Sequence, residues 1–306
     1  MVEAYRKAGG QDVFADSDIA HVVLERDRVM GANTVEGLEV DIEKQKPGMV
    51  AVRINVLAGA IIEKPVHMCF GVLPEKGKQF IDMDVEIGEK ASVEVKADCV
   101  FPNAISVEHR MEASVLVKEG ASFIYRESHF HGEGGGVEVK ARSRINLEKA
   151  STFKTYFDLQ KGRAGSVEFD YASELQEYAT LEMVARMQGR EDDRIRIKEA
   201  ADLTGRGARA LLESRLALQD RARGEVLNEL NAAAPDSRGH VECTEIIKNE
   251  ASARAVPIVD VQHPSAKVTH EAAIGSVDSG QLQTLMSRGL DEEEAADTII
   301  QGMLNG

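Results

Sequence analysis

Apolar and polar residues alternate along most of this chain. The alternation is clear in "MVAVRINVLAG" and "IDMDVEIGEKASVEVKADCV", where Val93, Val95, Ala97 and Cys99 fall on one parity. It continues through "ASVLVKEGASFIYRESHFH", "VEVKARSRINLEKASTFKTYFDL" and "SVEFDYASELQEYATLEMVARM". Because successive side chains of a strand point to opposite faces, the pattern predicts short strands over residues 49–273 with almost no helical interruption.

A weak repeat lies inside this β-like region. The segments "GEKASVEVKADC", "KEGASFIYRESH" and "LEKASTFKTYFD" each place a charged turn before an Ala-Ser pair and a strand. The pairs begin at Ala91, Ala121 and Ala150, so the offsets are 30 and 29 residues. A fixed period of this size favours a solenoid, in which each coil buries its apolar face on the next. A two-sheet sandwich is the alternative, because it also gives short strands at regular spacing. We expect a mainly β fold with a right-handed parallel β-helix core.

The first part of the chain has a different pattern. "SDIAHVVLERDRVMG" offers Ser17 or Asp18 as a helix N-cap before a set of apolar residues with helical spacing. The set comprises Ile19, Val22 and Val23. We therefore expect residues 1–48 to form a short N-terminal helical arm.

Two short helices are predicted over residues 274–306. Asp278 or Ser279 can cap the first, and Gly289 stands where a helix commonly ends. The second begins with Asp291 as N-cap and Glu294 at the capping-box position. The apolar faces comprise Leu282, Leu285 and Met286 in the first helix, and Ala295, Ile299, Ile300 and Met303 in the second.

Composition narrows the class of protein. Hydrophobic residues make up 43% of the 306 residues, which is typical of a globular chain. The net charge of −15 disfavours binding to nucleic acid or to anionic membranes. There is no apolar run long enough to span a membrane and no signal peptide, so we expect a cytoplasmic protein. The three cysteines are widely spaced and contain no C-x-x-C pair, which argues against structural zinc of the usual kind.

The end of the chain resembles a known family. "THEAAIG", "DSGQLQTLMSRG" and "EEEAADTIIQGM" are similar to the C-terminal signature of SufB/SufD proteins, the scaffold subunits of an iron–sulfur cluster assembly system. "VHMCFGV" and "SHFHGEGGGVEV" look like earlier family positions. The resemblance implies a parallel β-helix with a C-terminal helical segment, and a compact form of the family. It also implies a transient iron–sulfur cluster, since family members hold a nascent one.

The resemblance implies three cluster ligands, namely Cys243, His270 and Glu271. The histidine and glutamate match the family's "HEA" motif, and Cys243 is the cysteine on a preceding strand. A thiolate is a strong ligand for iron, whereas imidazole and carboxylate bind it more weakly, which suits a scaffold that must release its cluster. Other interpretations remain open. Cys243 and His270 can be buried core residues, and Glu271 can cap or salt-bridge at the helical junction.

Further histidines and cysteines allow a rival hypothesis. His129 and His131 share one strand face, and such a pair with a downstream glutamate is how a cupin enzyme holds a metal. His67 and Cys69 also share a face, as a possible metal pair or as packed side chains. Cys99 lies on the apolar parity and is expected in the core. The glycine-rich run at residues 132–136 lacks a P-loop lysine and a following helix, so it predicts no phosphate cradle.

We therefore expect a noncatalytic scaffold rather than an enzyme. The chain has no Walker motif, so ATP hydrolysis must come from a partner, and the resemblance implies a SufC-type ABC ATPase docked on the C-terminal region. The exposed residues expected to receive it are Gln283, Arg288, Glu292 and Glu293. A homodimer, or a heterodimer with a SufB/SufD paralogue, is expected. Some complexes of the family bind FAD, and nothing in the sequence indicates FAD.

Overall fold

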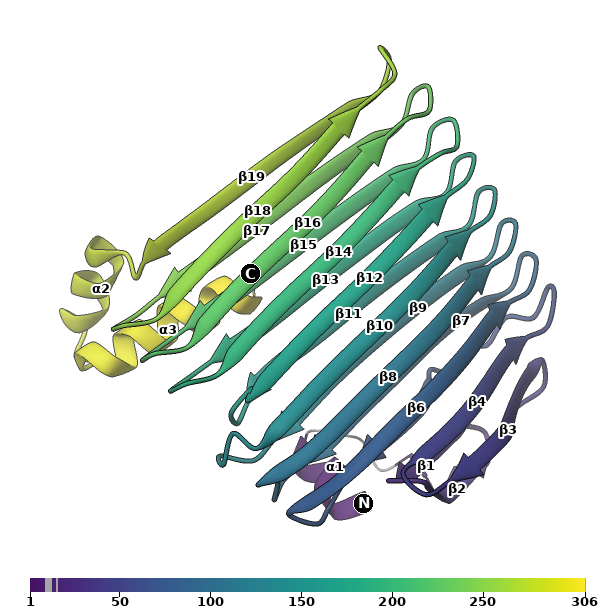
Figure 1. Cartoon of the computed structure of the whole chain (residues 1–306), viewed down its shortest axis with the longest axis horizontal. Helices are drawn as coiled ribbons and strands as arrows, with labels where there is room; N and C mark the ends of the chain where they lie inside the picture. The colour runs from purple at the N-terminus through teal and green to yellow at the C-terminus, as the bar shows by residue number, and fades with distance from the viewer. Residues whose placement is uncertain (9–12, 15, 306) are drawn as a thin grey trace.

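The chain forms a β-solenoid whose strands, after two N-terminal antiparallel pairs, alternate between two sheets (Figure 1). The computed structural model describes residues 1–8, 13–14 and 16–305. The ten-stranded sheet contains β1 (His21–Glu25), β2 (Arg28–Asn33), β5 (Val66–Gly71), β7 (Ser92–Phe101), β9 (Ser122–His131), β11 (Thr152–Lys161), β13 (Thr180–Gly189), β15 (Arg209–Leu218), β17 (Arg238–Ile247) and β19 (Lys267–Ser276). The nine-stranded sheet contains β3 (Leu38–Lys46), β4 (Met49–Val56), β6 (Lys76–Ile87), β8 (Ser106–Val117), β10 (Val137–Leu147), β12 (Ser166–Leu175), β14 (Arg194–Leu203), β16 (Arg223–Ala232) and β18 (Ser252–Val261).

Successive coils stack in parallel, so the β-helix prediction is confirmed and the sandwich alternative is wrong. Each strand from β7 to β17 pairs in parallel with a strand of the preceding coil and a strand of the next coil, as β9 does with β7 and β11. Alternate side chains point into the space between the sheets and form one continuous apolar core. Val93, Val95, Ala97 and Cys99 are all buried there, as their shared parity predicts.

Tight turns at one end of the strands explain the repeat. Lys90, Gly120 and Ala150 have positive φ angles of 55°, 67° and 53°, and the residue after each is small and buried. Ser122 pairs with both Ser92 and Thr152. The structural equivalent of Ala121 is therefore Ser151, not Ala150, and the second offset is 30 residues rather than 29. The sequence motif misplaced one coil by one residue because an alanine there occupies the left-handed position.

The glycine-rich run serves close packing of turns on the opposite side. A Cβ at Gly132 would lie 2.2 Å from the carbonyl oxygen of Pro102, and one at Gly136 would lie 2.2 Å from that of Ile105. Glycine is needed at both positions because neighbouring turns approach too closely for a side chain.

The expected helical arm is mostly wrong. Only α1 (Val2–Ala8) is helical, and residues 9–12 and 15 lie outside the described residues. The segment with helical spacing instead forms the β1–β2 hairpin, which turns at Arg26 with φ 52°. Val22 packs into the solenoid interior and Val23 packs under α1, so both faces of β1 are buried. A short apolar run buried on both sides carries no period that separates strand from helix.

The C-terminal helices form as predicted, and only one of them is anchored. These are α2 (Ser279–Met286) and α3 (Glu292–Asn305). The Asp278 side chain accepts from the Gln281 N–H at 2.7 Å, and Asp291 and Glu294 form a reciprocal capping box. α3 packs Ile300 and Leu304 on the outside of the ten-stranded sheet, whereas α2 has no buried residue. Within the described residues, no helix has the length and apolarity that crossing a membrane requires.

Candidate functional site

Cys243 lies inside the solenoid, on β17, in the last third of the chain. It pairs with Ser214 of β15 and with Ala272 of β19, and it is 1% exposed. The Nδ2 group of Asn228 on β16 donates to both the Ser214 hydroxyl, at 3.2 Å, and the Cys243 sulfur, at 3.8 Å. Asn228 thus reaches across the interior from the opposite sheet and holds the thiol in place.

Two buried carboxyl groups share this part of the interior. Glu199 and Glu245 are 3% and 1% exposed, and Glu199 pairs in register with Asn228. One carboxyl oxygen of Glu199 and both of Glu245 have no hydrogen-bond partner among the described residues. Each unmet buried group costs about 1–3 kcal/mol of folding stability. We call Glu199, Ser214, Asn228, Cys243 and Glu245 the interior polar cluster.

Burial dominates the protonation of this cluster. It raises the pKa of the Cys243 thiol to about 12, and the Glu245 and Glu199 carboxylates add to the effect. It also raises the pKa of Glu199 to about 8 and that of Glu245 to about 7. The thiol is therefore protonated at neutral pH, and an incoming metal ion must displace its proton.

His270 and Glu271 lie on β19, the last strand of the solenoid, and both are exposed. His270 pairs with Val241 and shares the interior parity of Ala272, which is the neighbour of Cys243. Glu271 pairs with Glu242 on the opposite parity. The structure therefore brings Cys243 and His270 to one face of adjacent strands and places Glu271 on the other face.

The final coil leaves the interior open at this end. Val261 of β18 and Ile274 of β19 are in register with the buried residues Ala232 and Glu245 of the preceding coil, so they lie on the interior faces of the two sheets. They are nevertheless 47% and 45% exposed. In Figure 1 the two helices lie beside the ends of the last strands and do not cover β18 and β19. Within the described residues, no strand pairs with the outer side of β18 or of β19.

The histidines of the rival metal-enzyme hypothesis lie in the solenoid interior, more than 100 residues before Cys243 in the sequence. His129 and His131 share one face of β9 as predicted, and both are buried. Glu133, the first glutamate after them in the sequence, is exposed. The acidic neighbour is instead Glu127, whose Oε1 lies 2.8 Å from Nε2 of His129.

Cys99 and His109 complete this group, and the sequence did not identify His109 or Glu127 as site residues. The Cys99 sulfur lies 3.8 Å from His109 Nε2 and 3.7 Å from Glu127 Oε1. One signal was present: both missed residues occupy interior parity positions, where most side chains of the solenoid are apolar. We call Cys99, His109, Glu127, His129 and His131 the histidine cluster.

The remaining predicted metal pair is packed under a helix. His67 and Cys69 are buried on the outer face of β5, beneath α1. The Tyr5 hydroxyl lies 3.1 Å from Nδ1 of His67, and burial raises the pKa of Cys69 to about 12. The packed interpretation therefore accounts for this pair.

The residues predicted to receive a partner are all exposed. Gln283 and Arg288 lie on and just after α2, and Glu292 and Glu293 form the first turn of α3. The predicted apolar face of α2 is not buried, and Met286 is 42% exposed. A groove between the two helices and the ends of β17 and β19 is lined by Leu285, Ile299 and Met303.

Comparison with known proteins places the whole chain in one family. Residues 73–303 match the family described as the SUF system FeS cluster assembly, SufBD core domain. An iron–sulfur cluster assembly SufBD family protein of Methanocaldococcus jannaschii is 32% identical over 283 residues, which cover 92% of this chain and 89% of the relative. A protein of the same description from Pyrococcus horikoshii is 33% identical over 304 residues, covering 99% and 92%. A third, from Archaeoglobus fulgidus, is 26% identical over 255 residues, covering 82% and 67%. The chain belongs to the SufBD family of iron–sulfur cluster assembly proteins.

Proposed function

We propose that this protein is a scaffold on which a nascent iron–sulfur cluster is assembled at the open end of the solenoid. The observation that carries the proposal is the pairing of β17 with β19, which sets the buried Cys243 and the exposed His270 on one face of adjacent strands. A thiol just inside the opening and an imidazole at its rim supply one strong and one weaker iron ligand.

Mixed ligation fits a protein that must release its cluster. Cys243 is the thiolate ligand in this proposal, and His270 and Glu271 are the weaker ligands. Glu271 lies on the opposite strand face, so it reaches the cluster only by bending around the edge strand or from a second chain. A cluster bound in this way exchanges more readily than one held by four thiolates.

A second copy of the chain, or a SufB/SufD paralogue, completes the site in this proposal. Val261 and Ile274 expose apolar surface at the open end, and β18 and β19 leave backbone donors and acceptors unpaired. Such edges pair readily with another strand. Joining two open ends would continue both sheets and enclose the cluster between two copies of Cys243 and His270.

The energy source in this proposal is a SufC-type ABC ATPase bound to the C-terminal helices. The apolar face of α2 is unburied, and it is flanked by the charged residues Arg288, Glu292 and Glu293. A partner that covers this face would bury apolar surface and find charged groups at its rim. The scaffold itself performs no ATP hydrolysis.

Anaerobic reconstitution of the purified full chain with iron and sulfide tests this function. We expect bound iron together with acid-labile sulfide, and transfer of both to an apo-ferredoxin. Bound iron without acid-labile sulfide would contradict the scaffold function and leave the cupin-like enzyme that uses His129 and His131 as the alternative.

A further inference from the structure

The histidine cluster joins three strands from both sheets at one point in the interior. Cys99 comes from β7, His129 from β9 and His109 from β8 of the opposite sheet. Each offers one donor atom, and the three atoms lie within 4.8 Å of one another. Within the described residues, this is the one set of three or more such side chains whose donor atoms come together in this way.

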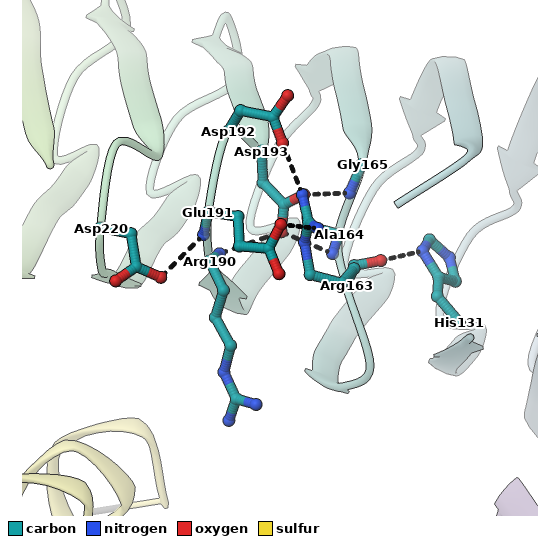
Figure 2. A network of polar contacts seen from close by, with 9 residues as sticks. All are labelled: His131, Arg163, Ala164, Gly165, Arg190, Glu191, Asp192, Asp193 and Asp220. Carbon is teal, nitrogen blue, oxygen red and sulfur yellow. Dashed lines mark hydrogen bonds and ion pairs between the residues drawn. The ribbon is translucent and has the colours of Figure 1, made fainter. Parts of the chain in front are cut away.

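A backbone carbonyl determines which nitrogen of each histidine donates in the series His131, His129 and Glu127. The Arg163 carbonyl accepts from His131 Nδ1 at 3.1 Å (Figure 2). Nε2 of neutral His131 must then accept, so Nδ1 of His129 donates across 3.2 Å. Nε2 of His129 is therefore left with its lone pair toward Glu127 Oε1, 2.8 Å away, and Glu127 carries the shared proton.

Arg163 is held firmly enough to impose this order. Its guanidinium donates to Asp193 at 2.9 Å and 3.1 Å, and the same carboxylate accepts from the backbone N–H groups of Ala164, Gly165 and Arg190 (Figure 2). A metal-binding histidine usually donates its other N–H to such an oriented acceptor, and His131 plays that part for His129.

His109 has no comparable partner among the residues that the structure describes. It is 1% exposed, its Nδ1 has no hydrogen-bond partner in this part of the chain, and its Nε2 lies 3.8 Å from the Cys99 sulfur. The ring of Phe101 packs against it at 5.0 Å between centroids. A buried imidazole with one nitrogen unpaired and the other aimed at a thiol is arranged as a metal ligand and poorly arranged as a structural polar group.

We propose that Cys99, His109 and His129 bind a divalent transition-metal ion of the Zn²⁺ class, at a site separate from Cys243. In a tetrahedral site a thiolate sulfur and an imidazole nitrogen lie about 3.5 Å apart, close to the 3.8 Å between Cys99 and His109. The set of one thiolate and two imidazoles suits Zn²⁺ or Fe²⁺ rather than Mg²⁺ or Ca²⁺.

Charge balance supports the site. Without metal, the thiol and the Glu127–His129 pair hold two protons and the cluster is neutral. A dication that displaces both protons leaves one thiolate and one carboxylate beside it, so the buried group stays neutral. The ion would tie the two sheets together through β7, β8 and β9.

The test uses a variant with Cys99 as its single cysteine. The chain has three cysteines, so the double variant Cys69→Ala/Cys243→Ala keeps only Cys99. It also removes Cys243 as the proposed ligand of the iron–sulfur cluster. Refolded anaerobically with Co²⁺, this variant should bind one ion and show a sulfur-to-cobalt charge-transfer band with tetrahedral d–d bands. His109→Ala in the same background should weaken Co²⁺ binding by about tenfold or more. His240→Ala, which removes a histidine outside the cluster, should leave it unchanged.

A second readout needs no ligand substitution. In the double variant, Zn²⁺ should slow alkylation of Cys99 in mild denaturant by about tenfold or more, because the bound ion holds the sulfur and the fold around it. A folded double variant without the charge-transfer band, or an alkylation rate that Zn²⁺ does not change, would show that the cluster is a protonated hydrogen-bond network without a metal. The test is independent of the proposed scaffold function, since Cys243 is absent throughout.

Discussion

Cys243 and His270 lie on the same face of adjacent parallel strands, and only the cysteine is covered. Cys243 of β17 pairs with Ala272, two residues after His270 on β19, and its exposure is 1%. The difference arises because β19 is the edge strand of its sheet, and no further coil packs over it in the part of the chain that the structure describes. Thiol and imidazole thus occupy the inside and the rim of one opening.

The open end of the solenoid predicts that two copies of the chain form a dimer there. Ile274→Arg places a charge on the exposed interior column of β19 and should convert a dimer into a monomer, because the charge would be buried without a partner. Ile61→Arg is the matched control, since Ile61 is 71% exposed at the other end of the chain. Light scattering on both variants measures the effect. A parent protein that is monomeric at all concentrations would contradict the prediction.

The C-terminal helices predict a separable partner site. Deleting residues 277–306 should leave the solenoid folded, because α3 packs on the outer face through a small cluster separate from the main core. The truncated chain should lose binding to a SufC-type ATPase, and Arg288→Glu in the full chain should weaken it. Pull-down and circular dichroism measure the two effects. Retained binding by a folded truncated chain would place the partner site elsewhere.

Asp193 should be the most costly single acid to remove. It is fully buried, and it compensates the charge of Arg163, whose side chain is 8% exposed. Asp193→Ala leaves that cation without its buried partner and should reduce the free energy of unfolding by roughly 3–5 kcal/mol. Asp192→Ala removes an Arg163 partner that is 78% exposed and should cost under about 1 kcal/mol. Urea denaturation of the two variants compares them. Equal losses would show that the Arg163–Asp193 pair is not the stabilising contact.

Glu199 predicts a pH dependence of stability. Burial raises its pKa from 4.5 to about 8, so the folded protein binds a proton that the unfolded chain releases. The contribution of Glu199 to the free energy of unfolding is fully present below pH 4.5. It is lost as pH rises toward 8, by at most about 1.4 kcal/mol per pH unit. Glu199→Gln should flatten the fall, with Glu245 retaining part of it. Urea denaturation across this window measures the slope, and exposed Glu250→Gln is the control. An unchanged slope in Glu199→Gln would contradict the assignment.

Cys99→Ala should lower the stability of the fold without lowering the content of iron–sulfur cluster. The side chain is fully buried, and removing its sulfur leaves a small cavity worth about 1 kcal/mol of unfolding free energy. Measured with a chelator present, its melting temperature should fall about as far as that of Cys69→Ala, since both thiols are fully buried. Reduced iron and sulfide content at an unchanged melting temperature would instead make Cys99 a ligand of the iron–sulfur cluster.

The strands and the solenoid could be predicted because their period is local. Alternation such as that of Val93, Val95 and Ala97 depends only on the pleat, and the caps at Asp278 and Asp291 depend on contacts three residues away. β1 could not be predicted in this way. Its residues are apolar on both faces because α1 covers one side and the interior lies on the other.

The position of the candidate site was partly predictable, because its motif is also local in the sequence. The motif around His270 identified the last strand, but neighbours that come from the opposite sheet or other coils, such as Asn228 and Glu199, have no local signal of proximity. The histidine cluster shows the limit more sharply. His129 and His131 could be paired from their spacing, whereas His109 joins them only because the solenoid brings β8 opposite β9.

The most direct test of the central claim is the iron and acid-labile sulfide content of Cys243→Ala after anaerobic reconstitution, with Cys69→Ala as the matched control. Both variants remove a buried thiol, and only Cys243 lies at the open end. We predict near-complete loss of iron and sulfide in Cys243→Ala, partial loss in His270→Ala and parental content in Cys69→Ala, with all three folded. Parental iron and sulfide in both Cys243→Ala and His270→Ala would contradict assembly at this end of the solenoid.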